Sequence, residues 1–333
     1  MEASVKYSVV IPVYNEEEVL DACYRRVKDV MEQTGEAYEI IFVNDGSYDS
    51  TPQKLENLAL LDRHVKWIDF SRNFGHQIAI TAGMDAAAGE AVIVMDADLQ
   101  DPPELILEMI SKWKEGYDVV YAKRQKRQGE TWFKKVTAAL FYRLLQKLTD
   151  LEIPLDTGDF RLIDRKVCDV LKTLKEKNRF VRGIVTWVGF RQTAVEYVRD
   201  PRYAGETKYP LKKMLKLSID AITSFSYKPL MIASYVGFAL SSISFLYLLY
   251  VLYLRLFGHA TVAGWASTVS IMLFFNGITL MMLGVMGQYI GRIYDESRNR
   301  PLYVVRRTMG FGRGQQKVTA EDLDQMPKEG VKQ

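Results

Sequence analysis

The chain of 333 residues is long enough for one large domain or two modest ones with a substantial core. Its net charge of +3 is too small to indicate a nucleic-acid-binding protein by charge alone. The two cysteines, Cys23 and Cys168, show no disulfide framework and no metal-ligand spacing, so we expect free thiols. Because a charged start is followed at once by a predicted strand, we expect no signal peptide.

Short runs of valine, isoleucine and phenylalanine alternate with helical stretches in the first half of the chain. The predicted strands are 7–13, 38–44, 65–70, 91–95 and 118–122. This alternation predicts an α/β domain with a mostly parallel sheet covered by helices on both faces. Such sheets bind ligands at the carboxyl ends of their strands, and polar motifs follow Val13, Val43 and Met95 there.

Two basic amphipathic segments, 132–148 and 211–225, come next. Each has apolar residues at helical spacing and lysines or arginines elsewhere, a pattern typical of helices at a membrane interface. Packing of each apolar face on the domain core is the alternative, but the neighbouring apolar segments favour the interfacial interpretation.

Two long apolar runs, 231–257 and 265–290, exceed the roughly 20 residues that a helix needs to span a bilayer. Lysines precede the first run and arginines follow the second, which predicts both chain ends on the cytoplasmic side. Gly287 and Gly291 form a small-xxx-small pair suited to helix packing. The predicted domains are a catalytic domain over 1–207 with an interfacial helix at 131–149, a juxtamembrane helix over 208–228, two transmembrane helices over 229–292 and a cytoplasmic tail over 293–333, disordered beyond Gly312.

The carboxylates of Asp96 and Asp98 directly follow a predicted strand. Two carboxylates at this spacing can share one hard cation such as Mg²⁺ or Mn²⁺, which would neutralise the diphosphate of a nucleotide sugar. A lone DxD is usually solvated charge. Here the run Gln100 to Glu104 follows it, and two more motifs end at the same edge of the sheet.

Those two motifs are VIPVYNEE, starting at Val10, and VNDGS, starting at Val43. Each is a strand followed by a polar turn, and Asp45 in the second could accept a hydrogen bond from the N–H of a nucleotide base. The alternative is that Asp45 and Ser47 only cap the next helix.

The motifs PVYNEE, VNDGSYDST, VMDADLQDPPE and TGDFRLIDR together resemble the polyprenyl-phosphate glycosyltransferases of family 2. This group includes dolichyl-phosphate mannose synthase and the GtrB-type undecaprenyl-phosphate glucosyltransferases, and the match covers nearly the whole chain. The resemblance implies a GT-A catalytic domain, a divalent metal, inversion at the anomeric carbon and often a tetramer.

The resemblance also assigns residues to roles. The donor nucleotide would contact Pro12, Tyr14, Glu16, Asp45, Asp96 and Gln100. The metal would be held by Asp96, Asp98 and Gln100. The catalytic residues would be Asp159, Asp98 and Arg124. The acceptor phosphate would be held by Arg124, Arg202 and Lys208.

A lipid phosphate acceptor changes the role expected of Asp159. The second pKa of a phosphate monoester is about 6, so the acceptor is largely dianionic at neutral pH and no proton has to leave. We therefore expect Asp159 to orient groups or bind metal rather than to act as an obligatory base. His64, His76 and His259 are scattered without metal spacing, and His76, although it follows a strand at the same edge, is expected to be structural.

Three functions compete on this sequence. A processive polysaccharide synthase needs more spans and a Gln-x-x-Arg-Trp-like motif, which is missing. A non-catalytic nucleotide-binding membrane scaffold is disfavoured by the intact Asp45, Asp96, Asp98 and Asp159. The remaining function is transfer of one sugar, preferably from UDP-glucose, to undecaprenyl phosphate at the cytoplasmic face of the bacterial cytoplasmic membrane by a homo-oligomer. N-acetylglucosamine, mannose and a modified pentose stay open as alternative sugars.

Overall fold

The computed structural model describes residues 4–125, 157–174, 176–177, 179–198, 228–257 and 264–311. The chain divides into two compact units, one formed by 1–139, 151–210 and 300–333, the other by 140–150 and 211–299. The two predicted amphipathic helices, Arg202 and Lys208 lie outside the described residues.

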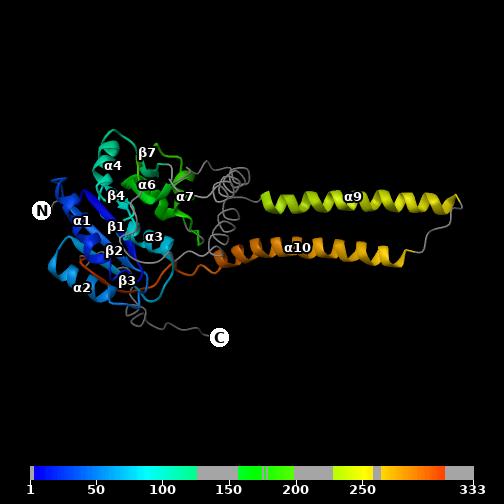
Figure 1. Ribbon diagram of the computed structural model, residues 1–333, viewed down its shortest axis with the longest axis horizontal. Helices are drawn as coiled ribbons and strands as arrows, with labels where there is room; N and C mark the ends of the chain where they lie inside the picture. The colour runs from blue at the N-terminus through cyan, green and yellow to red at the C-terminus, as the bar shows by residue number, and fades with distance from the viewer. Residues whose placement is uncertain are drawn as a thin grey trace, which may run out of the picture. The chain divides into compact units, whose positions relative to one another are not determined.

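The first unit is built on a mixed sheet with eight described strands (Figure 1). The strands are β1 (Tyr7–Val13), β2 (Tyr38–Asn44), β3 (Val65–Phe70), β4 (Ala91–Val94), β5 (Val119–Arg124), β6 (Thr157–Asp164), β7 (Gln192–Tyr197) and β8 (Val305–Met309). Their order in the sheet is β7-β5-β6-β4-β1-β2-β3-β8. The strands β4, β1, β2 and β3 are parallel neighbours, so their carboxyl ends meet at one edge, as the sequence predicted.

Three strands were not predicted from the sequence. β6 runs antiparallel between β4 and β5, β7 runs parallel to β5, and β8 runs antiparallel to β3. β8 belongs to the segment that the sequence analysis assigned to a cytoplasmic tail, and the structure places it at the edge of the sheet.

Helices cover both faces of the sheet, as the alternation of elements predicted. The helices of this unit are α1 (Leu20–Glu32), α2 (Thr51–Leu61), α3 (His76–Ala86), α4 (Leu105–Lys114), α6 (Arg165–Thr173) and α7 (Val181–Trp187). Side chains of α1, α2 and α4 form one core with the sheet residues Val9, Ile11 and Phe42. On the other face Gly83 of α3 lies directly against Val10 of β1, with no room for a β-carbon. Both cysteines are buried free thiols, and burial raises each pKa to about 12.

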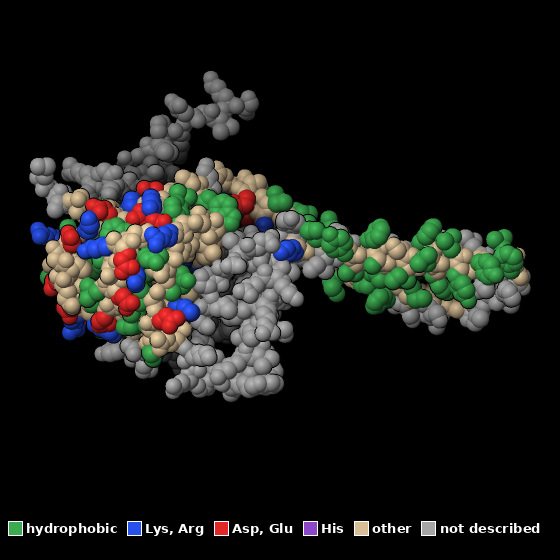
Figure 2. Space-filling model, turned by 90° about the horizontal axis from the view of Figure 1, so that it is seen from above, with side chains coloured by type: hydrophobic (Ala, Val, Ile, Leu, Met, Phe, Trp, Pro, Cys, Tyr) green, Lys and Arg blue, Asp and Glu red, His purple; other side chains and the backbone are tan. Residues whose placement is uncertain are grey.

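The second unit contains two long helices, α9 (Lys228–Leu256) and α10 (Trp265–Ser297), which lie side by side (Figure 1). Within the pair, Gly237 faces the side chain of Met282. Large apolar side chains such as Phe238, Leu246 and Met281 are exposed along the helices (Figure 2). Over the part of the chain that the structure describes, no helix combines the length and apolar character needed to cross a bilayer. The transmembrane assignment of 229–292 therefore stays a prediction.

Candidate active site

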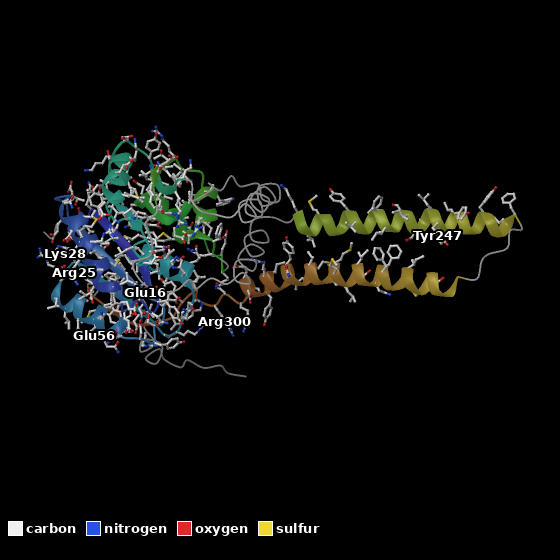
Figure 3. The ribbon with its side chains drawn as sticks, in the orientation of Figure 1. Glu16, Arg25, Lys28, Glu56, Tyr247 and Arg300 are labelled. Carbon is white, nitrogen blue, oxygen red and sulfur yellow. The ribbon has the colours of Figure 1, made fainter. Side chains whose placement is uncertain are left out.

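The loops after β1 and β2 are joined by hydrogen bonds at the carboxyl edge of the sheet. Asn15 has a left-handed backbone with a φ of 53°, and its N–H donates to Ser47 Oγ at 2.9 Å. The Asn15 side chain in turn accepts the N–H of Tyr48 at 2.8 Å. The Tyr14 and Tyr48 rings meet edge to face at 6.2 Å. Glu16, labelled in Figure 3, lies on the same loop, and its N–H donates to Thr51 Oγ1 at 3.0 Å.

Asp45 binds the loop that leads into α3. Its carboxylate accepts the N–H of Phe74 at 2.6 Å and that of Gly75 at 3.0 Å, and the residue is only 4% exposed. Burial raises the pKa of Asp45, and these two N–H groups oppose that shift. The described side-chain hydrogen bonds of Asp45 therefore go to the start of α3, rather than to α2 as the capping alternative required.

Gly46 permits this loop to pack closely on the turn after β2. Its φ is 70°, and a β-carbon there would lie 2.5 Å from the carbonyl carbon of Arg72. Gly35 has a similar φ of 66° but no atom within 4 Å of its own β-carbon position.

We predict that Gly46→Ala destabilises the chain more than Gly35→Ala. Both pay about 1–2 kcal/mol for an alanine in the left-handed region, but only Gly46→Ala also pushes the Arg72 backbone away. Denaturant unfolding of the two variants measures the difference. Equal losses would contradict the close packing of this loop.

Asp96 and Asp98 lie on the turn after β4, each partly buried. The structure describes no group of three or more histidine, cysteine, aspartate or glutamate side chains that could hold a metal by itself. Asp96 Oδ1, however, is a buried oxygen that accepts no hydrogen bond among the described residues, and His76 Nε2 lies 3.2 Å from it. Two carboxylates and the nearby amide of Gln100 are the hard oxygen donors that Mg²⁺ and Mn²⁺ prefer. These residues would fit a divalent metal if further ligands were supplied by a bound molecule.

Asp159, on β6, is the centre of a buried charge network. Arg182 of α7 donates to both carboxylate oxygens, from Nε at 2.8 Å and from a terminal nitrogen at 3.0 Å. Gln77 Nε2 donates at 3.1 Å, and His76 Nε2 lies 3.3 Å away. His76 thus contacts both Asp96 and Asp159, so the structure brings the predicted metal turn and the predicted catalytic aspartate to one point.

These contacts determine the charge of the network. Burial alone would raise the pKa of Asp159, but Arg182 and His76 outweigh burial and hold that pKa well below the usual range. Burial likewise opposes a charged His76, yet Asp96 and Asp159 raise the pKa of this imidazole well above its usual value. The geometry therefore favours the ionised form of the Asp159 carboxylate, and the role of Asp159 stays a prediction.

Arg124, at the end of β5, belongs to a second network. Its Nε donates to the hydroxyl of Tyr197 at 3.1 Å, and that hydroxyl donates to Asp101. Burial, together with Asp101, raises the pKa of Tyr197 to about 12, so its proton stays on the hydroxyl. A terminal nitrogen of Arg124 also lies close to Gly158, where a β-carbon would be 3.0 Å from it. Arg124 of β5 therefore lies next to Gly158 of β6, the residue that precedes Asp159.

Two arginines near Asp159, Arg161 and Arg182, were not predicted from the sequence. Arg161 is 4% exposed, donates to the carbonyl of Gly158 at 3.0 Å, and has its pKa lowered to about 10 by burial. Arg182 had one usable signal, an arginine within the apolar run VRGIVTW. His76, expected to be structural, touches both the Asp96 and the Asp159 carboxylates at the centre of the site.

The predicted donor and metal residues lie at the carboxyl edge of the sheet, at or just after the ends of strands. They are Pro12, Tyr14, Glu16, Asp45, Asp96, Asp98 and Gln100.

Comparisons with known proteins agree with this architecture. The Glycosyl transferase family 2 model matches residues 8–171. A protein of Bacillus subtilis (strain 168), described as an uncharacterized glycosyltransferase, is 66% identical over 311 residues, covering 93% of this chain and 96% of the relative. A bactoprenol glucosyl transferase of Shigella phage SfII is 43% identical over 304 residues, covering 91% and 98%.

Among solved structures, glucosyl-3-phosphoglycerate synthase from Mycobacterium tuberculosis with Mn²⁺, UDP-glucose and phosphoglyceric acid is 18% identical with a TM-score of 0.45, covering 66% of this chain and 78% of that one. This similarity is too distant to carry an argument. The sequence relatives decide the matter: the chain belongs to glycosyl transferase family 2 and is a glycosyltransferase with a GT-A type α/β fold.

Proposed function

We propose that this enzyme transfers a single sugar, with UDP-glucose as the preferred donor, to undecaprenyl phosphate with inversion at the anomeric carbon. The observation that carries the proposal is the meeting of Asp96 and Asp159 at His76 beside the arginine network. This arrangement offers one place for a donor diphosphate and an anionic acceptor. The relatives named bactoprenol glucosyl transferase support glucose and a polyprenyl acceptor, because bactoprenol is undecaprenol.

The donor nucleotide would bind across the loops after β1 and β2. Pro12, Tyr14 and Glu16 lie on the first loop and Asp45 on the second, at the edge where parallel sheets bind ligands. The hydrogen bonds between these loops hold this surface in place before the donor arrives. Binding therefore requires little ordering of the backbone.

Asp96 and Asp98, with Gln100, would hold Mg²⁺ or Mn²⁺ against the donor diphosphate. When bound, the metal neutralises charge that develops on the leaving nucleoside diphosphate. Asp96 contributes the buried oxygen described above. Asp98 Oδ1 accepts the N–H of Gln100 at 3.2 Å, which fixes the turn that carries all three residues.

In the transfer step, an oxygen of the lipid phosphate attacks the anomeric carbon. A new carbon–oxygen bond forms as the bond to the nucleoside diphosphate breaks, and the electron pair leaves with UDP. No proton is lost from the dianionic acceptor, so the step needs electrostatic stabilisation of two anions rather than a base. Arg124 would bind the acceptor phosphate, together with Arg202 and Lys208 from outside the described residues.

Asp159 would orient the site. It binds Arg182 at two points and contacts His76, so it fixes two cationic groups beside the reacting atoms. Its depressed pKa makes it a poor general base at neutral pH, which favours the positioning role.

The acceptor lipid implies a membrane, and we propose that α9 and α10 anchor the enzyme there as a two-helix hairpin. Their exposed apolar side chains, including Tyr235, Ile243 and Leu280, would contact lipid rather than water. The excess of lysine and arginine outside the pair favours chain ends and catalytic domain at the cytoplasmic face, and we expect a homo-oligomer.

A transfer assay tests this function. Purified full-length protein in detergent is incubated with undecaprenyl phosphate, Mg²⁺ or Mn²⁺ and a panel of labelled nucleotide sugars. We expect label from UDP-glucose in the lipid fraction and loss of that label with EDTA. Label from another donor only would correct the sugar. Nucleotide binding without a lipid product from any donor would favour the non-catalytic scaffold.

A further inference from the structure

We infer that β8, at the end of the described chain, is a positioning element of the donor-nucleotide site. The inference rests on the proposed function for the identity of the ligand. The residues that carry it are Arg306 and Arg307 of β8, Asp69 of β3 and Asn44 of β2. β8 lies outside residues 8–171, which the family model matches, so this contribution comes from a separate part of the chain.

β8 is the edge strand of the sheet and holds the neighbouring strand β3 in place. It pairs antiparallel with β3, and the loop after β3 continues the contact because Ser71 N–H donates to Val304 O at 3.0 Å. The ring of Tyr303 stacks on Phe70 with centroids 5.1 Å apart. The segment 303–309 therefore covers the end of β3, where the loop that binds Asp45 begins.

A register shift between β3 and β8 directs the side chains of two arginines toward the buried carboxylate of Asp69. Asp69 pairs with Arg307 and Phe70 pairs with Val305, so Arg306 is the extra residue of a bulge. Neighbouring side chains of a regular strand point to opposite faces, but a bulge re-aims them. Both arginines accordingly reach Asp69 Oδ2, from an Arg306 terminal nitrogen at 3.5 Å and from Arg307 Nε at 3.8 Å. Asp69 is 1% exposed, so it depends on such charge partners.

Two further contacts hold Arg307 in place. Its guanidinium lies 4.7 Å from the centre of the Trp67 ring, and a terminal nitrogen lies 3.1 Å from Glu56 Oε1 on α2. Stacking and an ion pair restrict this side chain at the surface and keep its charge beside Asp69.

Hydrogen bonds connect Asp69 to the loops after β1 and β2, where the donor nucleotide is proposed to bind. Asn44 Nδ2 donates to Asp69 Oδ1 at 2.7 Å. The other end of the same amide, Asn44 Oδ1, accepts the hydroxyl of Ser47 at 2.6 Å. Ser47 Oγ then accepts the Asn15 N–H at 2.9 Å, on the loop that carries Tyr14 and Glu16. An unbroken chain of contacts therefore joins β8 to both donor loops.

A second route runs through the loop after β3. Arg306 donates to Ser71 O at 2.9 Å, and the same loop supplies the Phe74 and Gly75 N–H groups that bind Asp45. Removing the arginines would loosen Asn44 on one side and the Asp45 partners on the other. Donor binding should weaken, whereas the described contacts of Asp159 with His76, Gln77 and Arg182 do not involve Arg306 or Arg307.

Calorimetric titration of the full-length chain with UDP-glucose and Mn²⁺ tests the inference. Arg306→Ala/Arg307→Ala should raise the Kd for UDP-glucose by about tenfold, the effect expected when contacts to a charged group are lost. Arg306→Lys/Arg307→Lys keeps the charge and should recover most of the affinity. The KM for undecaprenyl phosphate should stay unchanged in both variants.

The matched control is Arg25→Ala/Arg191→Ala. Arg25 is an exposed residue of α1, and Arg191 stacks on Tyr117 at 4.4 Å much as Arg307 stacks on Trp67. This control removes two positive charges without touching Asp69, and its Kd should equal that of the wild type.

A double-mutant cycle separates positioning from general loss of structure. In an Asp69→Asn background the carboxylate that needs the arginines is gone and only the Arg306 contact with Ser71 is left to lose, so Arg306→Ala/Arg307→Ala should raise the Kd by a smaller factor than in the wild type. Wild-type affinity in the arginine variant, or an undiminished loss in the Asp69→Asn background, would overturn the role of β8. A wild-type chain that binds no nucleotide sugar would overturn this inference and the proposed function together.

Discussion

Asp159→Asn should lower kcat by about 100-fold, with little change in the KM for the donor. The substitution keeps the shape of the side chain but removes the charge that holds Arg182 and His76 in place. Those two cationic groups would then lose their orientation toward the reacting atoms, whereas the donor loops stay intact. Steady-state kinetics of lipid glycosylation with varied donor measures both constants.

The pH profile distinguishes orientation from base catalysis. If Asp159 orients the site, the wild type and Asp159→Asn should give parallel profiles, with an acidic limb near the phosphate pKa of about 6. A variant whose rate recovers fully above that pH would instead identify Asp159 as the base. Asp118→Asn is the matched control, because Asp118 is also a paired carboxylate but its partners are Lys166 and the Arg191 N–H.

Asp159 should also stabilise the fold over a defined pH range. Because its folded-state pKa is depressed, its stabilisation is fully present above the unfolded value of about 4 and is lost as pH falls through the folded value. Asp159→Asn breaks a buried ion pair, which costs about 3 kcal/mol at neutral pH. Denaturant unfolding at pH 7 measures this loss, and an unchanged midpoint would contradict the network.

Asp98→Asn should lower kcat by about 1000-fold and weaken the dependence of donor binding on Mn²⁺. A metal at the diphosphate supplies several kcal/mol of transition-state stabilisation, and each 1.36 kcal/mol corresponds to a factor of ten. Titration of Mn²⁺ at fixed UDP-glucose should give a higher half-saturating concentration for this variant.

Asp169→Asn provides the control for Asp98→Asn. Asp169 is an exposed carboxylate on α6 beside Arg165, so its loss changes the charge equally without touching the turn after β4. If Asp98→Asn and Asp169→Asn had the same metal dependence, Asp98 would not be a metal ligand.

The sequence predicted the first half of the fold well because each of its strands carries its own signal. The runs 7–13, 38–44 and 65–70 are buried β-branched segments, and the structure gives strands with those same bounds. Asp45 follows the second of these strands and Asp96 follows β4, and parallel pairing of β4, β1 and β2 places both at one edge. The apolar pattern of each strand and the alternation of strands with helices were sufficient to predict this half of the fold and the edge that carries the site.

The remaining elements depend on contacts between distant parts of the chain. β8 is a short, charged segment, VRRTM, whose strand conformation comes from pairing with β3 rather than from alternation of apolar residues. The contact of Arg182 with Asp159 requires α7 to pack beside β6, which no spacing in the sequence encodes. His76 was expected to be structural because its partners, Asp96 and Asp159, are far from it in the sequence.

The most direct test of the account is the chemical identity of the product. Wild-type enzyme, UDP-glucose, Mn²⁺ and undecaprenyl phosphate are allowed to react, and mass spectrometry with phosphorus NMR follows the lipid and the released nucleotide. We expect a phosphodiester joining glucose to the lipid, with one UDP released for each molecule formed, and no product from undecaprenol. Free glucose released with UDP, or glucose attached to undecaprenol, would contradict the claim that a lipid phosphate is the acceptor.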